Sequence, residues 1–131
     1  MTLVGLYLIK QQIMKTLNKT SVLLVEDDVD MRNTISENLK AVDYKVYATR
    51  KSIEGLELFK KYDVDICILD VEMTGMDGFA LAAQIRMLNP DMPVIFLVSK
   101  GLFLNLLKDF EYGVDDYITK PIRPKVLISR I

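Results

Sequence analysis

The chain has 131 residues, 50% of them hydrophobic and 27% charged, which suits one compact domain and leaves no room for two. Its 17 basic and 18 acidic residues give a net charge of -1, so no overall basic field exists to hold nucleic acid or an anionic membrane. The absence of histidine excludes Ser-His and Cys-His nucleophile pairs. The single cysteine, Cys67, excludes an internal disulfide and a zinc site, and indicates a buried thiol in a reducing, cytoplasmic setting. Any chemistry must therefore use carboxylates, hydroxyls and lysines.

The first 20 residues differ from the rest, because they carry three lysines and no acid. Their longest apolar stretch, residues 3–9, is too short for a membrane span and lacks the flanks of a secretory signal. Met14 offers a second possible start, so we favour an N-terminal extension over residues 1–20 that arose at the start of the gene. The alternative is a functional element that docks on this domain or on another copy through a loose helical stripe. That stripe consists of Leu3, Leu6, Tyr7, Ile13 or Met14, and Leu17.

From residue 21 onward, strand-like and helix-like segments alternate along the chain. This alternation is typical of an α/β domain in which a doubly wound parallel sheet carries helices on both faces. The first strand, residues 22–25, is a continuous run of Val and Leu, which suits a strand buried on both sides. We expect further strands at residues 45–48, 66–69, 94–98 and 117–118.

Apolar residues at helical spacing predict the helices between these strands. Ser52 is a suitable N-cap for the second helix, and the acidic residues Asp28, Asp30 and Asp77 suit helix starts. Pro124 has a first-turn position in a last helix. The residues expected to face the sheet are Met31, Ile35 and Leu39 in the first helix, Ile53, Leu56 and Phe59 in the second, and Leu81, Ala82, Ile85 and Leu88 in the third.

The fourth helix, expected over residues 102–112, is apolar almost all round at its start. One face must pack on the sheet, and Leu106 or Leu107 with Phe110 can supply it. Adjacent helical positions lie ~100° apart, so residues 102–104 cannot all share that face. We therefore expect an exposed apolar surface for self-association or for the N-terminal stripe. The alternative is a helix that slides or partly unwinds to bury the surplus.

Charged residues gather where the predicted strands end. Glu26 and Asp27 follow the first strand, Asp70 closes the third, and Lys120 follows the fifth. The carboxyl ends of parallel strands share one edge of a sheet, so we expect these side chains to converge there. Carboxylates that converge repel each other unless a cation lies between them, and Mg²⁺ prefers such oxygen ligands. The pattern predicts a magnesium site with a lysine that could hold a phosphoryl oxygen.

The chain also carries four motifs in a fixed order: VLLVEDD at 22–28, LDVEMTGMDG at 69–78, PVIFL at 93–97 and GVDDYITKP at 113–121. Together they resemble the receiver domain of two-component response regulators, and the resemblance covers residues 21–131. It implies a five-stranded, flavodoxin-like three-layer α/β/α fold with strand order 2-1-3-4-5. It also implies that the chain stops within its last helix and that an output domain lies beyond it.

Carried over residue by residue, the resemblance assigns roles to the acidic cluster. Asp70 matches the phosphoacceptor, the nucleophile that takes a phosphoryl group from the histidine of a sensor kinase. Asp27 and its neighbour Glu26 match the Mg²⁺ ligands, completed by Asp70 and by the backbone carbonyl of Glu72. Lys120 matches the lysine that pairs with Asp70 and later with the phosphate. The resemblance also implies a cis peptide bond directly after Lys120.

Two positions depart from the family pattern. The usual Met-Pro after the phosphorylated strand is Met73-Thr74 here, which loosens that loop without removing a ligand. Receivers usually place Thr or Ser at the end of the fourth strand, where its hydroxyl bonds a phosphoryl oxygen, and the aligned residue here is Val98. Ser99 comes one residue late, so its side chain should aim differently unless a local bulge restores it. Val98 and Ser99 are therefore our switch positions together with Tyr117, which matches the family's aromatic switch residue.

Two questions stay open near the site, one about Tyr117 and one about Glu72 and Lys100. Tyr117 is either a switch ring or a half-buried edge aromatic. Glu72 and Lys100 flank the pocket mouth at positions that affect phosphoryl hydrolysis in the family. They either form an ion pair across the mouth or are solvated independently, and we favour independent solvation.

The sequence thus predicts a phosphorelay signalling module rather than an enzyme with turnover. Its expected partners are a sensor histidine kinase and a second copy, bound through the fourth helix, fifth strand and fifth helix. DNA contact is expected only through a missing output domain, of the winged-helix type that controls transcription. The alternative is a pseudo-receiver that acts as an interaction or dimerisation module without phosphorylation.

Overall fold

The computed structural model describes residues 2–17, 19–106 and 116–131. Its five strands form one parallel sheet in the order β2-β1-β3-β4-β5, which confirms the expected fold class. The predicted strand ends are each correct to within one residue. The elements are α1 (Leu3–Leu17), β1 (Ser21–Val25), α2 (Val29–Ala41), β2 (Lys45–Thr49), α3 (Ser52–Lys61), β3 (Ile66–Asp70), α4 (Gly78–Leu88), β4 (Val94–Val98), α5 (Lys100–Leu106), β5 (Asp116–Thr119) and α6 (Pro124–Arg130).

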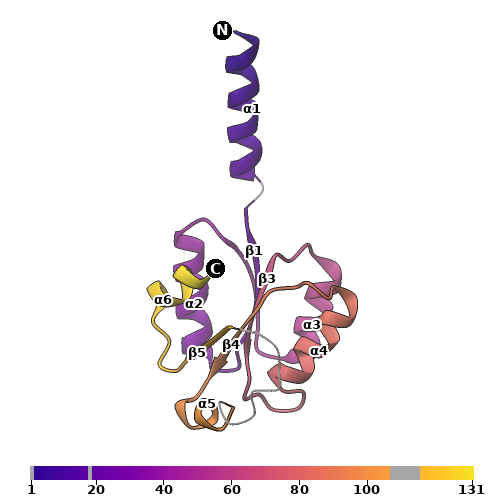
Figure 1. Ribbon diagram of the computed structural model, residues 1–131, viewed down its shortest axis with the longest axis vertical. Coiled ribbons are helices and arrows are strands. Elements are labelled where there is room, and N and C mark those ends of the chain that lie inside the picture. The colour runs from indigo at the N-terminus through magenta and orange to yellow at the C-terminus, as the bar shows by residue number, and fades with distance from the viewer. Residues whose placement is uncertain (1, 18, 107–115) are drawn as a thin grey trace.

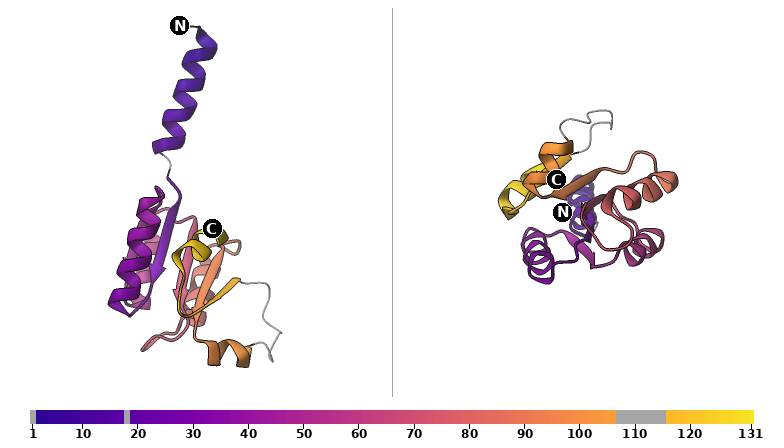
Figure 2. Two further views of the ribbon diagram at one scale, coloured as in Figure 1. Left: turned by 90° about the vertical axis from the view of Figure 1, so that its left-hand side faces the viewer. Right: turned by 90° about the horizontal axis from the view of Figure 1, so that it is seen from below.

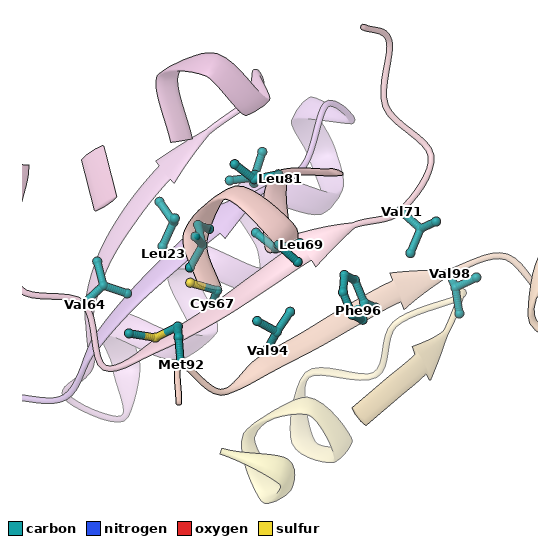
Figure 3. Close-up of a cluster of buried hydrophobic side chains, with 13 residues drawn as sticks. Leu23, Val64, Cys67, Leu69, Val71, Leu81, Met92, Val94, Phe96 and Val98 are labelled. Carbon is teal, nitrogen blue, oxygen red and sulfur yellow. The ribbon is translucent and has the colours of Figure 1, made fainter. Parts of the chain in front are cut away.

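Helices cover the two faces of the sheet, with α2 and α6 on one side and α3 and α4 on the other (Figure 1). Side chains alternate along each strand, so β1 contributes Leu23 and Val25 to one core and Val22 and Leu24 to the other. The core under α3 and α4 is built around Leu69 and other aliphatic side chains (Figure 3). A sheet covered in this way leaves its carboxyl edge as the place for chemistry.

Two acids predicted to start helices do so. The Asp28 carboxylate accepts a hydrogen bond from the Met31 amide at 2.8 Å and caps α2. Asp77 caps α4 in the same way, accepting from the Ala80 amide at 2.8 Å. These contacts satisfy amides that have no partner within their own helix. Asp28 and Asp77 are therefore structural, although both lie close in sequence to the acidic cluster.

The predicted inner faces of two helices need correction. Lys51 and not Ser52 precedes α3, and the buried Ser52 hydroxyl donates to the Met76 carbonyl at 2.7 Å. Because Ser52 and Gly55 face the core, Ile53 is turned away and is 66% exposed. Leu88 is 54% exposed, since α4 ends at this residue and the core beyond it is filled by Met92.

Helix α1 extends away from the domain, beyond the amino end of β1 (Figures 1 and 2). Leu3 is 87% exposed, and Leu6, Tyr7 and Ile13 are exposed as well. These described members of the stripe do not dock on their own domain, and docking on another copy stays a prediction. Within the described residues, no helix combines the length and apolar character that a membrane crossing requires.

The start of the predicted fourth helix forms α5. Leu102 and Phe103 are partly buried against the core, whereas Leu104 is 61% exposed. An outward-facing apolar side chain was expected here, and Leu104 confirms it. Leu107 and Phe110, two of the residues expected to pack on the sheet, lie outside the described residues.

Candidate functional site

The candidate site lies at the carboxyl ends of β1, β3 and β5. Glu26 directly follows β1, Asp70 is the last residue of β3, and Lys120 follows β5. The strands are parallel and in register, with Val25 beside Leu69, so their ends meet at one edge of the sheet. The structure thus brings together the acids and the lysine that the sequence placed at separate strand ends.

Asp70 is almost completely buried, with 1% of its surface exposed. Its Oδ2 accepts a hydrogen bond from Lys120 Nζ at 3.1 Å, and its Oδ1 accepts one from the Glu72 amide at 3.1 Å. Burial raises the pKa of Asp70, and its contacts with Lys120 and the Glu72 amide offset this rise only in part. Both carboxylate oxygens are therefore held in fixed positions.

Glu26 is fully buried beside Asp70. Its Oε1 accepts from the Asp28 amide at 3.2 Å and lies 3.7 Å from Lys120 Nζ, but its Oε2 has no hydrogen-bond partner within the described residues. Burial raises the pKa of Glu26 to about 8, and the Asp70 carboxylate adds to this effect. A buried carboxylate oxygen without a partner is costly, so this atom marks a place where a ligand would be stabilised.

The residues present fit a divalent cation. Carboxylate oxygens of Glu26, Asp27 and Asp70 all lie within 4.8 Å of one another. Oxygen ligands of this kind, with one exposed member that leaves room for water, are the donor set that Mg²⁺ prefers. The unpartnered Glu26 Oε2 supports the same assignment. The fourth expected ligand, the backbone carbonyl of Glu72, remains a prediction.

Among the described ion pairs, those that involve the acidic cluster all use Lys120, which pairs with Glu26 and Asp70. Burial lowers the pKa of Lys120, but Glu26 and Asp70 more than offset this effect, so its pKa lies above the usual value. Its peptide bond to Pro121 is cis, as the resemblance implied. Lys120 is thus charged and directed at the carboxylate of Asp70.

Arg32 is a residue that the sequence reasoning missed. Its Nη1 donates to the Glu26 carbonyl at 2.8 Å and to the Asp27 carbonyl at 3.5 Å. It therefore holds the backbone of the two acids that follow β1. The sequence feature that could have indicated this role is the position of Arg32 in the first turn of the helix that follows the two acids.

Val98 and Ser99 occupy different environments. Val98 is fully buried in the core under α3 and α4, and β4 pairs residue for residue with β3 and β5, so no bulge brings Ser99 into the place of Val98. The Ser99 hydroxyl donates to Glu72 Oε1 at 2.5 Å and accepts from the Leu102 amide at 3.3 Å. Ser99 therefore bonds a side chain at the mouth of the site and the first turn of α5.

The structure agrees with the favoured alternative, because the side chains of Glu72 and Lys100 are both exposed and none of the described ion pairs joins them. Glu72 is bonded instead by Ser99. A short hydrogen bond to a neighbouring hydroxyl needs less ordering of long side chains than an ion pair does.

Tyr117 is half-buried in a group of aromatic rings. Its ring stacks on Phe96, with centroids 5.5 Å apart and planes 27° apart. Phe79 lies at 6.5 Å on the α4 side, and Phe103 of α5 lies at 6.3 Å. Tyr117 thus contacts α5 directly, and both interpretations of this residue remain open.

Comparisons with known proteins agree with this geometry. Residues 22–131 match the family described as the response regulator receiver domain. The transcriptional regulatory protein RprY of Bacteroides fragilis is 39% identical over 113 residues, covering 86% of this chain and 48% of that protein. The cell cycle response regulator CtrA of Brucella abortus is 34% identical over 110 residues, covering 84% of this chain and 47% of that protein. This chain thus spans about half the length of these curated relatives.

Solved structures show the same architecture. The chemotaxis protein CheY4 of Vibrio cholerae has a TM-score of 0.77 at 25% identity and covers 86% of this chain and 95% of its own. A response regulator of Chloroflexus aurantiacus has a TM-score of 0.77 at 29% identity, covering 86% of this chain and 94% of its own. With its 2-1-3-4-5 sheet and its acidic edge, the chain belongs to the response regulator receiver domain family of two-component systems.

Proposed function

We propose that Asp70 accepts a phosphoryl group from the phosphohistidine of a sensor kinase and that Mg²⁺ is required. The observation that carries this proposal is the position of Asp70, which is buried at the sheet edge, bonded to Lys120 and clustered with Glu26 and Asp27. A carboxylate in such a setting is a nucleophile whose charge is balanced by its neighbours. Family membership supports the same role.

In the proposed reaction, one Asp70 carboxylate oxygen attacks the phosphorus atom and the bond from phosphorus to the donor nitrogen breaks. The product is an acyl phosphate on Asp70, and the electron pair of the broken bond returns to the donor imidazole. Lys120 neutralises Asp70 before transfer and can pair with a phosphoryl oxygen afterwards. Mg²⁺, held by Glu26, Asp27, Asp70 and the Glu72 carbonyl, would stabilise the charge that develops on the phosphoryl oxygens.

We further propose that the signal reaches an output domain that controls transcription in the cytoplasm. Two observations support this: the relatives carry names of transcriptional and cell cycle regulators, and this chain spans about half of their length. Self-association is proposed through α5, β5 and α6, where Leu104 is 61% and Val126 is 40% exposed. DNA would be bound by the output domain alone.

Intact mass spectrometry after incubation with acetyl phosphate and Mg²⁺ tests the phosphoacceptor. The parent protein should gain the mass of one phosphoryl group, and Asp70→Asn should gain none. Asp77→Asn is the matched control, because Asp77 caps α4 and Asn can replace it as a cap. A parent that takes up no phosphoryl group, or an Asp70→Asn variant that still does, would contradict the assignment.

A second candidate function is a pseudo-receiver that binds partners without phosphorylation, and the burial of Val98 favours it. Without a hydroxyl at this position, one charge-assisted hydrogen bond to a phosphoryl group is missing, worth roughly 1.5–3 kcal/mol. The Val98→Thr variant distinguishes the two candidates. Under the first, its phosphorylation-dependent dimerisation strengthens about tenfold or more. Under the second, sedimentation of parent and variant is the same with and without acetyl phosphate.

A further inference from the structure

One hydroxyl connects the loop after Asp70 to the first turn of α5. Ser99 Oγ donates to Glu72 Oε1 at 2.5 Å and accepts from the Leu102 amide at 3.3 Å. The Ser99 carbonyl accepts from the Phe103 amide at 2.9 Å, so the same residue ends the connection from β4 and starts α5. Two segments that are 27 residues apart in sequence therefore meet at one side chain.

This contact fixes a residue that also touches the phosphoacceptor. The Glu72 amide donates to Asp70 Oδ1 at 3.1 Å, while the Glu72 carboxylate is held by Ser99. The Glu72 residue is thus anchored at both its backbone and its side chain. Its position therefore influences how one Asp70 oxygen is oriented, and it would also set where the Glu72 carbonyl, the predicted fourth Mg²⁺ ligand, lies.

The two residues beside Ser99 do not make this contact. Val98 is fully buried in the core and has no polar side-chain atom. Lys100 makes none of the described ion pairs with Glu72. Among the described residues, Ser99 therefore provides the polar connection between the β4–α5 segment and the loop after Asp70.

We propose that Ser99 is a positioning residue for phosphoryl acceptance, which acts by holding Glu72 and, through it, the oxygen atoms of the Asp70 site. This inference rests on the proposed function and deepens it. The departure at Val98 does not remove every hydroxyl from this end of β4. It leaves one, on Ser99, that orders the loop after Asp70.

A double-mutant cycle of Ser99→Ala and Glu72→Ala isolates the bond from the other effects of each change. Ser99→Ala also removes the contact with the Leu102 amide, and Glu72→Ala also removes a charge near the cation site. Those separate effects cancel in the coupling between the two changes. Ser99→Thr keeps a hydroxyl, and Glu72→Gln keeps an oxygen that can accept from it.

The readouts are the Kd for Mg²⁺ by titration calorimetry and the rate of phosphoryl uptake by intact mass. Each alanine variant should weaken both by about three- to tenfold, the effect of one charge-assisted hydrogen bond at a partly exposed position. If the two residues act through their bond, the loss of Mg²⁺ affinity and of uptake rate in the double variant should be smaller than the product of the two single losses. The difference should exceed about twofold, the limit expected for independent sites. Ser99→Thr should restore at least half of the loss seen in Ser99→Ala.

A double variant whose losses equal the product of the two single losses would overturn the inference. A Ser99→Thr variant that behaves like Ser99→Ala would also overturn it. A parent protein that takes up no phosphoryl group would contradict the proposed function instead. The Mg²⁺ titrations still decide the role of Ser99 in that case, because they do not require phosphorylation. Circular dichroism at each titration temperature confirms that every variant is folded.

Discussion

Replacing Gly78 with alanine should disturb both the fold and the phosphoacceptor. Gly78 begins α4, and its amide donates to the Val71 carbonyl at 3.1 Å, so this residue lies directly against the end of β3. A Cβ at Gly78 would lie 2.3 Å from the Asp70 carbonyl oxygen and 2.9 Å from both the Asp70 carbonyl carbon and Val71 Cα. All three atoms belong to the backbone, so a side-chain rotation cannot relieve the contact.

The size of the effect follows from these distances. A carbon atom approaches a carbonyl oxygen to about 3.3 Å, so the backbone at Asp70 and the start of α4 must separate by roughly 1 Å. Forcing atoms into a packed region typically costs about 1–3 kcal/mol. Because the displaced residue is Asp70, we also expect phosphoryl uptake to slow by up to ~100-fold, the effect of misplacing a reacting group by this distance.

Urea unfolding followed by circular dichroism measures the first effect, and intact mass with acetyl phosphate measures the second. Gly101→Ala is the matched control, because Gly101 is exposed in α5 and a Cβ there would meet no atom within 4 Å. That variant should be unchanged or more stable by up to about 1 kcal/mol, since alanine favours helix. A Gly78→Ala variant with the parent's midpoint and uptake rate would refute the reasoning.

Three further predictions concern the metal, the thiol and the exposed leucine. Asp27→Ala should weaken Mg²⁺ binding at least about tenfold in calorimetry, whereas Asp30→Ala should not, because Asp30 lies outside the acidic cluster. Burial raises the pKa of Cys67 to about 12, so a thiol reagent at pH 8 should modify it only after unfolding. Since this folded pKa exceeds the unfolded value near 9.0, the free energy of unfolding should fall by about 1.4 kcal/mol per pH unit between these values, as urea titrations would measure. Leu104→Ser should weaken any self-association in sedimentation about tenfold, and Leu88→Ser, which changes a similarly exposed leucine on α4, should not.

The strands were predictable because burial on both faces requires continuous apolar runs. Residues 22–25, 66–69 and 94–98 are such runs, and each is a buried strand. Parallel pairing then places the ends of β1, β3 and β5 at one edge, so the meeting of Glu26, Asp70 and Lys120 followed from the order of elements. The acidic site was therefore largely readable from the sequence.

Contacts that depend on side-chain direction were not predictable. Whether Ser52 or Ile53 faces the core is decided by a rotation of α3 that also brings Gly55 against Val25, and periodicity alone does not fix it. The reach of Arg32 back to the Glu26 carbonyl depends on how α2 leaves β1.

The loss of a hydroxyl at Val98 has a physical meaning that the packing makes clear. Valine and threonine are both β-branched and differ by a methyl group in place of a hydroxyl, so Val98 fills the core under α3 and α4, where Tyr117 also packs, without offering a hydrogen bond. Tyr117 packs against this core and lies 6.3 Å from Phe103 of α5, so apolar packing joins the core to α5 through Tyr117. What differs from the usual receiver pattern is one polar atom, and the hydroxyl one residue later, on Ser99, bonds Glu72. Val98→Thr adds that polar atom at a fully buried position, so its stability in urea must be measured beside its switching, because a buried hydroxyl without a partner is destabilising.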